Sequence, residues 1–473
     1  MTTSSSSFGK TISVGGTVVV GVKFCTAISK SIPANEPALI KLKNERNPDK
    51  LFHLFKANAE NKLVVENRFA FEDTVSRLAA ARRFDYIDQL LEQQKSLPQG
   101  RREGFIVRII TLYGNAGMTK HAVDTFYNMH LFGCSQTVKS FNAALKVLTQ
   151  TRDLQLIRSF LNEAPQKFCI SRDIYSVNIV IKAFCEMGFL DSAYLVMIQM
   201  EEEGIIPDVV THTTLISAFY KNNRCEIGNG LWNLMILKGC YPNLVTFNVR
   251  IQHLVNKRKA FLANKLMGRM SHIGIKPDEL TFNLVIKGFF LIGNAQMAKR
   301  IYSAFQAQHY KPNSMIYQTM IHYLCEGREF DLAYTFCKDS MHKNWFPNVD
   351  TVCMLLEGLL RNPKGKKAKV IMTLIQGRVP PYSVEEVRTF IHYLCKGKGF
   401  DLAYAFCIDS MTKNWFPSAD AICMLLKELP INPKGKKAKV LMTLIRGRLP
   451  PYSAKELKMF DNILSSKPKM ASG

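Results

Sequence analysis

Small polar residues recur at fixed intervals along this chain, and their side chains supply hydrogen-bonding groups. One series, with members 35 residues apart, consists of Asn178, Thr213, Asn248 and Asn283. A second series with the same spacing consists of Asp208, Asn243, Asp278 and Asn313. Amide and hydroxyl groups both donate and accept hydrogen bonds, whereas an ionised carboxylate only accepts. Both series are therefore candidates for ligand contacts at regular steps.

The same residue types also have a structural interpretation. Asn at the start of a helix and Asp or Asn in a loop are ordinary capping and turn residues. Both interpretations stay open until the geometry of the repeated element is known.

The elements that must position these residues follow from a proline period. Five prolines stand 35 residues apart, and each is followed by Asp or Asn: Pro207, Pro242, Pro277, Pro312 and Pro347. A fixed period of this length is the signature of a solenoid in which one supersecondary element is stacked many times.

Residues 209–243 predict the form of that element. Apolar residues have helical spacing from Thr211 to Tyr220, residues 221–223 make a turn, and a second helix runs from about residue 225 to 238. Gly239 supplies a left-handed C-terminal cap, and Pro242 blocks any continuation. A helical hairpin cannot bury its apolar faces alone, so it must stack on its neighbours.

This frame divides the chain into segments. The repeats are 103–137, 138–173, 174–208, 209–243, 244–278, 279–313, 314–348, 349–383, 384–418 and 419–453. Residues 36–102 are interpreted as degenerate N-terminal capping repeats, and residues 454–473 as a C-terminal tail. The predicted fold is all-α, a right-handed superhelical solenoid of about 11–12 helix-turn-helix repeats.

Charge favours a polyanionic partner. The formal net charge is +25 and the pI is near 9.5, and such an excess attracts nucleic acid through phosphate neutralisation. A membrane surface is the competing polyanion, but no segment offers the roughly 20 apolar residues that a span requires.

Twelve cysteines are present, yet no CxxC occurs, so neither a zinc ribbon nor a thioredoxin-like site is expected. Several cysteines share a repeat position: Cys185, Cys325 and Cys395 at the twelfth residue, and Cys353 and Cys423 at the fifth. Free cysteine behaves as a small buried hydrophobe, so these residues are predicted to pack between helices. No metal or cofactor is predicted.

The first 35 residues contain no acidic residue, are rich in Ser and Thr, and carry Lys10, Lys23 and Lys30. This composition is typical of an organellar transit peptide. A disordered tail is the alternative.

The C-terminal repeats contain a duplication. Residues 321–382 and 391–452 are identical at 45 of 62 positions, at an offset of two whole periods. Each copy carries a lysine-rich run in the turn between its two helices. The lysines of these runs form a candidate basic patch: Lys364, Lys366, Lys367, Lys434, Lys436 and Lys437. A solvated surface and docking on structured RNA are the two interpretations.

A 35-residue helical hairpin with (Ser/Thr)-(Tyr/Phe/His)-Asn/Thr opening the first helix and Pro-Asp or Pro-Asn closing the loop resembles the pentatricopeptide repeat (PPR) family. The match is carried by VVTHTTLISAFYKNNRCEIGNGLWNLMILKGCYPN, LVTFNVRIQHLVNKRKAFLANKLMGRMSHIGIKPD and ELTFNLVIKGFFLIGNAQMAKRIYSAFQAQHYKPN. The repeats are similar to the plain 35-residue (P-type) subclass of plant organelles, and closest to short mitochondrial members linked to ribosomes.

The resemblance implies that the protein binds single-stranded RNA, one base per repeat, with the fifth and last residues of each repeat on the base edge. Asn142 with Asp173, Asn178 with Asp208, and Asn248 with Asp278 would favour U; Thr213 with Asn243 would favour A, and Asn283 with Asn313 C or U. The second residue of each repeat would wedge between bases, at Lys139, Tyr175, Val210, Val245 and Leu280. Other pairs, such as Gln318 with Asn348, are not readable. The family also implies a phosphate contact for Lys221.

No catalytic signature accompanies the repeats: no HxE with PCxxC, no nucleophile elbow, no HExxH and no dinucleotide fingerprint. The prediction is a non-enzyme without a small-molecule substrate. Two functions remain: a single-stranded RNA binder in mitochondrial RNA metabolism or translation, with the plastid as alternative location, or a structural subunit docked on the mitochondrial ribosome or its rRNA.

Overall fold

The computed structural model describes residues 37–360, 366–376, 384–396, 399–412, 416–428, 436–447 and 452–465. The predicted transit peptide, residues 1–35, lies outside this part of the chain. Helices and turns account for all regular structure in the described ranges, and none of the helices there is long and apolar enough to cross a membrane. The chain forms two compact units, residues 1–207 and 208–473, each of which we describe by itself.

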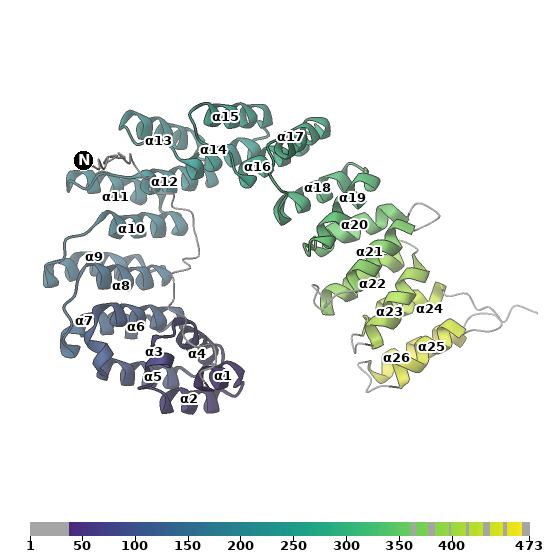
Figure 1. The fold of residues 1–473 in the computed structure, drawn as a ribbon, viewed down its shortest axis with the longest axis horizontal. Coiled ribbons are helices and arrows are strands. Elements are labelled where there is room, and N and C mark those ends of the chain that lie inside the picture. Colours follow the sequence, from purple (N-terminus) through teal and green to yellow (C-terminus); the bar gives the residue numbers. More distant parts are fainter. Residues whose placement is uncertain are drawn as a thin grey trace, which may run out of the picture. The chain divides into compact units, whose positions relative to one another are not determined.

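The first unit begins with short helices and continues as helical hairpins (Figure 1). Its elements are α1 (Pro37–Asn44), α2 (Pro48–Ala57), α3 (Lys62–Glu66), α4 (Arg68–Ala80), α5 (Phe84–Ser96), η1 (Pro98–Arg101), α6 (Glu103–Asn115), α7 (Thr119–Tyr127), η2 (Met129–Phe132), α8 (Val138–Gln150), α9 (Leu154–Phe168), α10 (Ile174–Met187) and α11 (Leu190–Glu202).

The second unit is built of the same hairpins in succession. Its elements are α12 (Val209–Lys221), α13 (Cys225–Leu237), α14 (Leu244–Asn256), α15 (Ala260–His272), α16 (Glu279–Leu291), α17 (Ala295–Ala307), α18 (Ser314–Glu326), α19 (Phe330–His342), α20 (Val349–Leu360), α21 (Lys366–Gln376), α22 (Val384–Lys396), α23 (Phe400–Thr412), α24 (Ala419–Glu428), α25 (Lys436–Arg446) and α26 (Ala454–Ser465).

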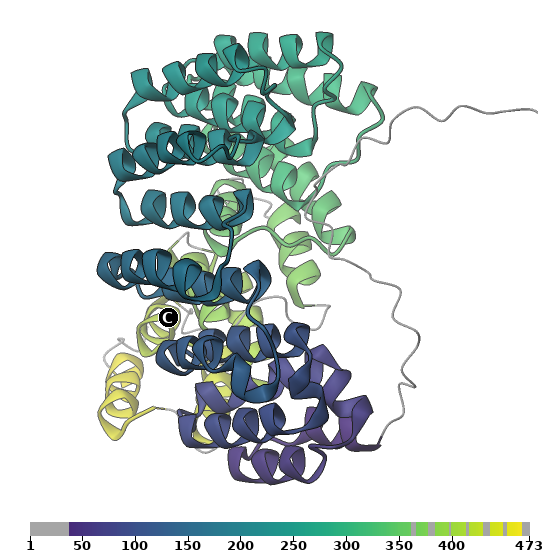
Figure 2. The same cartoon turned by 90° about the vertical axis from the view of Figure 1, so that its left-hand side faces the viewer.

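Within each unit the first helix of a hairpin stacks on that of the next hairpin, and in most hairpins the two helices also pack together. In the second unit α12 contacts α13 and α14, and α14 contacts α15 and α16. Figure 2 shows this layering from the side. The prediction of an all-α solenoid of stacked hairpins is confirmed within each unit.

The hairpin limits follow from local chemistry. The structure starts α12 at Val209, two residues before the predicted start, because the Asp208 side chain accepts a hydrogen bond from the backbone N–H of Thr211 and so caps the helix. Gly239 follows α13 with a φ of 73°, a left-handed conformation that costs glycine little. The predicted glycine cap is therefore confirmed.

In most hairpins a small residue lets the second helix approach the first, whereas α9 has the buried Ile157 at this position. The small residues include fully buried alanines: Ala122, Ala193, Ala263, Ala298, Ala333, Ala368 and Ala403. At the equivalent Gly228 an added Cβ would lie 2.5 Å from a ring carbon of Tyr220. Side-chain volume at this position therefore limits how closely the hairpin closes.

The cysteines behave mostly as predicted. Cys325, Cys353, Cys395 and Cys423 are buried, and Cys185 is partly buried. Burial raises the pKa of the Cys325 thiol to about 12, so this group stays protonated at neutral pH. Among the described residues no cluster of His, Cys, Asp or Glu has the arrangement of a metal site.

Candidate nucleic-acid interface

The last residues of the repeats are helix N-caps. They are Asp173 for α10, Asp208 for α12, Asn243 for α14, Asp278 for α16 and Asn313 for α18. At Asp278 the Oδ1 atom accepts from the backbone N–H of Thr281 at 2.8 Å, and the Thr281 hydroxyl oxygen accepts from the Asp278 N–H at 3.3 Å. The capping interpretation of these residues is therefore confirmed.

The cap hydrogen bonds use only some of the polar atoms of these side chains. The hydrogen bonds of the Asp278 carboxylate all use Oδ1, and in the described part of the chain Oδ2 has no partner. At Asn243 the cap likewise uses Oδ1, which accepts from the Thr246 N–H at 3.0 Å. At Asp278 and at Asn243, one polar atom of the side chain thus remains for another molecule.

The fifth residue of a repeat lies beside the last residue of the same repeat. Asn248 Nδ2 donates to Asp278 Oδ1 at 3.2 Å, and in the first unit Asn142 Nδ2 donates to Asp173 Oδ1 at the same distance. The structure thus brings these two predicted pairs into direct contact.

The other predicted pairs differ. Thr213 reaches Asn243 only indirectly, because its hydroxyl contacts the Thr246 hydroxyl at 2.7 Å, which in turn donates to Asn243 Oδ1 at 3.0 Å. The buried Oδ1 atom of Asn283 has no hydrogen-bond partner in the described residues. Asn178 and Asp208 belong to different units: Asn178 lies on α10, partly buried, and Asp208 caps α12.

The fifth-position asparagines are more buried than expected of groups that point out of the stack. Asn142 and Asn248 are 7% exposed and Asn283 is 5% exposed. Only an edge of each amide can therefore meet a ligand in this conformation.

Four of the five predicted second residues are exposed and apolar, and the fifth, Lys139, is exposed and basic. Val245 is 54% exposed and Leu280 is 39% exposed, on α14 and α16 of the second unit. Val210 in the second unit and Tyr175 in the first are also exposed. Exposed apolar side chains at a constant step are typical of a surface that contacts another molecule.

A pocket joins these features in the second unit. It has a volume of about 360 Å³ and includes Val245, Leu280, Asn248, Asp278 and Lys221 in its lining. The stacked rings of Tyr220 and His253, with centroids 3.9 Å apart, form part of its wall. Burial, together with the nearby charges of Lys257, Arg250 and Lys259, lowers the pKa of His253, so the positive charge at this pocket comes from Lys221.

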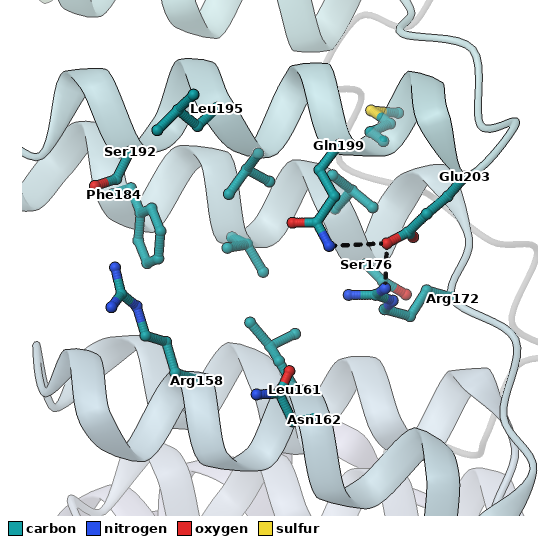
Figure 3. Close-up of a pocket in the computed structure, with 14 residues that line it drawn as sticks. Arg158, Leu161, Asn162, Arg172, Ser176, Phe184, Ser192, Leu195, Gln199 and Glu203 are labelled. Carbon is teal, nitrogen blue, oxygen red and sulfur yellow. Dashed lines mark hydrogen bonds and ion pairs between the residues drawn. The ribbon is translucent and has the colours of Figure 1, made fainter.

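The first unit has a pocket of different composition. About 330 Å³ in volume, it is lined by residues of α9, α10 and α11, among them Arg158, Leu161 and Leu195 (Figure 3). The ion pair between Arg172 and Glu203, at 2.6 Å, lies at one end. No fifth residue of a repeat lines this pocket, so we do not assign it to the interface.

The lysine-rich runs are only partly described. Lys364 and Lys434 lie outside the described residues, and Lys436 begins α25 with a side chain that is not described. Lys366 is exposed at the start of α21. Lys367 and Lys437 are exposed but paired: Lys367 Nζ lies 2.6 Å from Asp331 Oδ1, and Lys437 Nζ lies 2.7 Å from Asp401 Oδ1. Part of the charge of each run therefore serves contacts with the preceding repeat.

A layer of hydroxyl groups lies beneath the caps, and sequence reasoning gave these groups no role although the opening motif includes their Ser or Thr. It is formed by the third residue of the first helix: Ser140, Ser176, Thr211, Thr246, Thr281 and Thr351. All are fully buried. The motif already showed that these residues recur, whereas their contacts with the preceding repeat could not be read from spacing.

Known proteins are similar to this chain in sequence, and a solved structure is similar to it in fold. A sequence profile of the PPR repeat family matches residues 172–221, 207–256 and 242–290, and a PPR repeat profile matches residues 108–134. A mitochondrial pentatricopeptide repeat-containing protein of Arabidopsis thaliana is 64% identical over 223 residues, which are 46% of this chain and 56% of that protein. The chain thus spans little more than half the length of this relative.

Two further similarities cover more of the chain. The small ribosomal subunit protein mL103 (rPPR7) of Arabidopsis thaliana is 31% identical over 343 residues, or 72% of this chain and 83% of that protein. The crystal structure of PPR10 from maize aligns with a TM-score of 0.54 at 18% identity, covering 92% of this chain and 64% of that one, a similarity of fold. The chain belongs to the pentatricopeptide repeat family.

Proposed function

We propose that this protein binds single-stranded RNA, without catalysing a reaction on it, and acts in mitochondrial RNA metabolism or translation. The observation that carries the proposal is the pocket of α14 and α16. It combines two exposed apolar side chains, Val245 and Leu280, with the hydrogen-bonded pair Asn248 and Asp278 and the cation Lys221.

Each of these groups suits one part of a nucleotide. Val245 and Leu280 can pack against the faces of a base. The Asp278 Oδ2 atom can accept from the N3–H of uracil, while the Asn248 amide can donate to a uracil carbonyl oxygen. Lys221 can neutralise a phosphate. In this proposal residues 244–278 read U, residues 209–243 read A, and residues 279–313 read C or U.

The mitochondrial location rests on two observations. The composition of residues 1–35 is that of a transit peptide, and the first relative described above is named as mitochondrial. We assign residues 1–35 to a presequence, residues 36–102 to capping repeats and residues 103–453 to the repeat array of the plain 35-residue subclass.

Binding of the full chain to labelled RNA tests the function. An oligonucleotide containing U-U-A-U-C should bind more tightly than one with the same composition in scrambled order, and single-base changes at A or the following U should weaken binding. Equal affinity for all sequences at matched salt concentration would contradict base reading.

A second candidate is a structural subunit of the mitochondrial ribosome. A specific observation favours it: the 31% identity to a small ribosomal subunit protein extends over 83% of that protein. The duplicated basic end is consistent with docking on rRNA through phosphates. Sedimentation of mitochondrial extract separates the two candidates, because a structural subunit co-migrates with a ribosomal subunit and a free binder stays in a light, RNase-sensitive particle.

A further inference from the structure

Two fifth-position asparagines of the second unit, Asn248 and Asn283, occupy equivalent sites but differ in how their amides are held. Asn248 Nδ2 donates to Asp278 Oδ1 at 3.2 Å, and Asn248 Oδ1 accepts from the Thr281 hydroxyl at 2.7 Å. Both ends of this amide are engaged, so its orientation is determined by the protein.

Asn283 has neither contact. The residue that corresponds to Thr281 is Ile316, which has no hydroxyl and is fully buried. The residue that corresponds to Asp278 is Asn313, whose Oδ1 accepts from the Ile316 N–H at 3.1 Å. Asn283 Oδ1 is buried without a partner among the described residues. A side-chain amide without a hydrogen-bond partner can rotate by half a turn, which exchanges the positions of its donor nitrogen and its acceptor oxygen.

A hydroxyl at the third position is not sufficient by itself. In the first unit the Ser176 hydroxyl donates to Asp173 Oδ1 at 2.7 Å, and Asn142 Oδ1 remains without a partner. The single hydrogen of the Thr281 hydroxyl is shared between Asp278 Oδ1 and Asn248 Oδ1, each 2.7 Å from the hydroxyl oxygen. A contact between the third-position hydroxyl and the asparagine Oδ1 atom therefore distinguishes the repeat that contains Asn248 from the repeat that contains Asn142.

We propose that the third residue of the following repeat is a positioning residue for base selection: Thr281 holds the Asn248 amide with its donor toward the base, and Ile316 leaves the Asn283 amide free to present either group. This inference rests on the proposed base reading. A held donor beside the Asp278 carboxylate suits U alone among pyrimidines. Uracil offers an N3–H to the carboxylate, whereas cytosine would place its N3 lone pair there.

The free amide at Asn283 explains tolerance of two bases at the next step. With Asn313 as a neutral neighbour, Asn283 can donate to N3 or O2 of cytosine, or turn and accept from N3–H of uracil. Holding the Asn283 donor outward should therefore favour cytosine, whose Watson–Crick edge offers two adjacent acceptors, over uracil.

The test is a matched pair of substitutions in the full chain, Ile316→Thr and Ile316→Val. Threonine and valine have the same shape, so both remove the same packing volume, but only threonine supplies a hydroxyl to Asn283. The probes are RNAs ending the core in C or U, U-U-A-U-C and U-U-A-U-U. Ile316→Thr should raise the preference for C over U by about five-fold, the factor that one net hydrogen bond supplies, and Ile316→Val should leave the ratio unchanged.

Thr281→Val provides the converse measurement if Ile316→Thr does not fold. It removes the hydroxyl from Asn248 and should reduce discrimination of U against C at the fourth base by a few-fold, while discrimination at the fifth base stays constant. Ser176→Ala serves as its control, since that hydroxyl caps a helix without touching Asn142 Oδ1.

The outcomes distinguish a failure of the positioning role from a failure of base reading itself. Unchanged C-to-U ratios in both Ile316→Thr and Thr281→Val, in a wild-type protein that does prefer A-U-(C/U), would overturn the positioning role alone. A wild-type protein with no base preference at these steps would overturn the base reading and this inference together.

Discussion

The repeats of residues 209–313 and those of residues 349–453, both in the second unit, share one scaffold but offer different side chains at the fifth position. In the former the fifth residues are Thr213, Asn248 and Asn283, which can exchange hydrogen bonds with a base. In the latter the fifth residues are Cys353, Arg388 and Cys423. The two cysteines are buried, and Arg388 Nε donates to the backbone oxygen of Phe416 at 2.7 Å. Hairpin formation and base reading therefore depend on different positions.

The shared part of the two regions includes the small residue that lets the hairpin close. Ala298 and Ala403 are both fully buried on the second helix. We expect Ala298→Leu and Ala403→Leu each to destabilise the protein by about 1–3 kcal/mol, because extra methylene groups in a packed interior force strain. Urea unfolding followed by circular dichroism measures the loss. A substantial loss at one site and none at the other would show that the two regions do not share their packing.

A substitution that should change the preferred base tests the residue pairs in which the two regions differ. Asn243→Asp keeps the cap on the Thr246 N–H but replaces an amide by an acceptor-only carboxylate. The preferred third base should change from A to G, whose Watson–Crick edge offers N–H donors, by about 1–3 kcal/mol if one mismatch costs what it does in DNA complexes.

The matched control for this swap is Asn348→Asp. Asn348 also caps a helix, α20, by accepting a hydrogen bond from the Thr351 N–H at 3.0 Å. The fifth residue of its repeat, however, is Gln318. The Gln318 amide is engaged at both ends, with Nε2 donating to the Thr351 hydroxyl at 2.6 Å and Oε1 accepting from the Asn348 N–H at 2.9 Å. Base preference should not change in Asn348→Asp, and an equal effect of the two substitutions would remove the distinction between the regions.

Removing the charge of the lysine-rich runs tests what residues 349–453 contribute to binding. Neutralising Lys364, Lys366, Lys367, Lys434, Lys436 and Lys437 together should weaken RNA or ribosome association and flatten its salt dependence. Each lost phosphate contact reduces the slope of log affinity against log salt by roughly 0.7–0.9. Because Lys367 and Lys437 also pair with Asp331 and Asp401, a change of slope smaller than that for six contacts is expected. An unchanged slope would leave these lysines as solvated surface.

The smallest effect concerns acid, at a cap of the first unit. Burial acts to raise the pKa of Asp173, but hydrogen bonds from Ser176 and Asn142 outweigh it and leave the pKa below its ordinary value of 3.8. A group whose pKa is lower in the folded state than in the unfolded state stabilises the protein when the pH is above its ordinary pKa. This stabilisation is lost as the pH falls through the folded-state pKa. Thermal unfolding should show a stability difference between wild type and Asp173→Asn that shrinks as the pH is lowered below 3.8. A difference independent of pH would exclude this linkage.

Much of the fold could be predicted because its signals are local. The proline period, the left-handed Gly239 and the polar residue after each proline predict where hairpins begin and end, and the first helices α12, α14 and α16 start at these caps. The predicted start of α12 was two residues late, because an apolar pattern marks the buried face of a helix and not its cap.

The candidate site was predictable only as a set of positions. Spacing alone indicated that Asn248 and Asp278 recur in phase, and the structure places them 3.2 Å apart. The same spacing made Asn283 equivalent to Asn248, although the two amides have different partners. The difference arises at the last residues, Asp278 and Asn313, and at residues 281 and 316, which lie one repeat further along the chain.

The sequence by itself determined the repeat period, the hairpin and the polar series, because turns, caps and helical periodicity act over a few residues. Only the tertiary structure decided which atoms of that series remain for a ligand. Stacking brings the third residue of one repeat against the fifth residue of the preceding one, and a buried polar atom must find its partner there or remain without one.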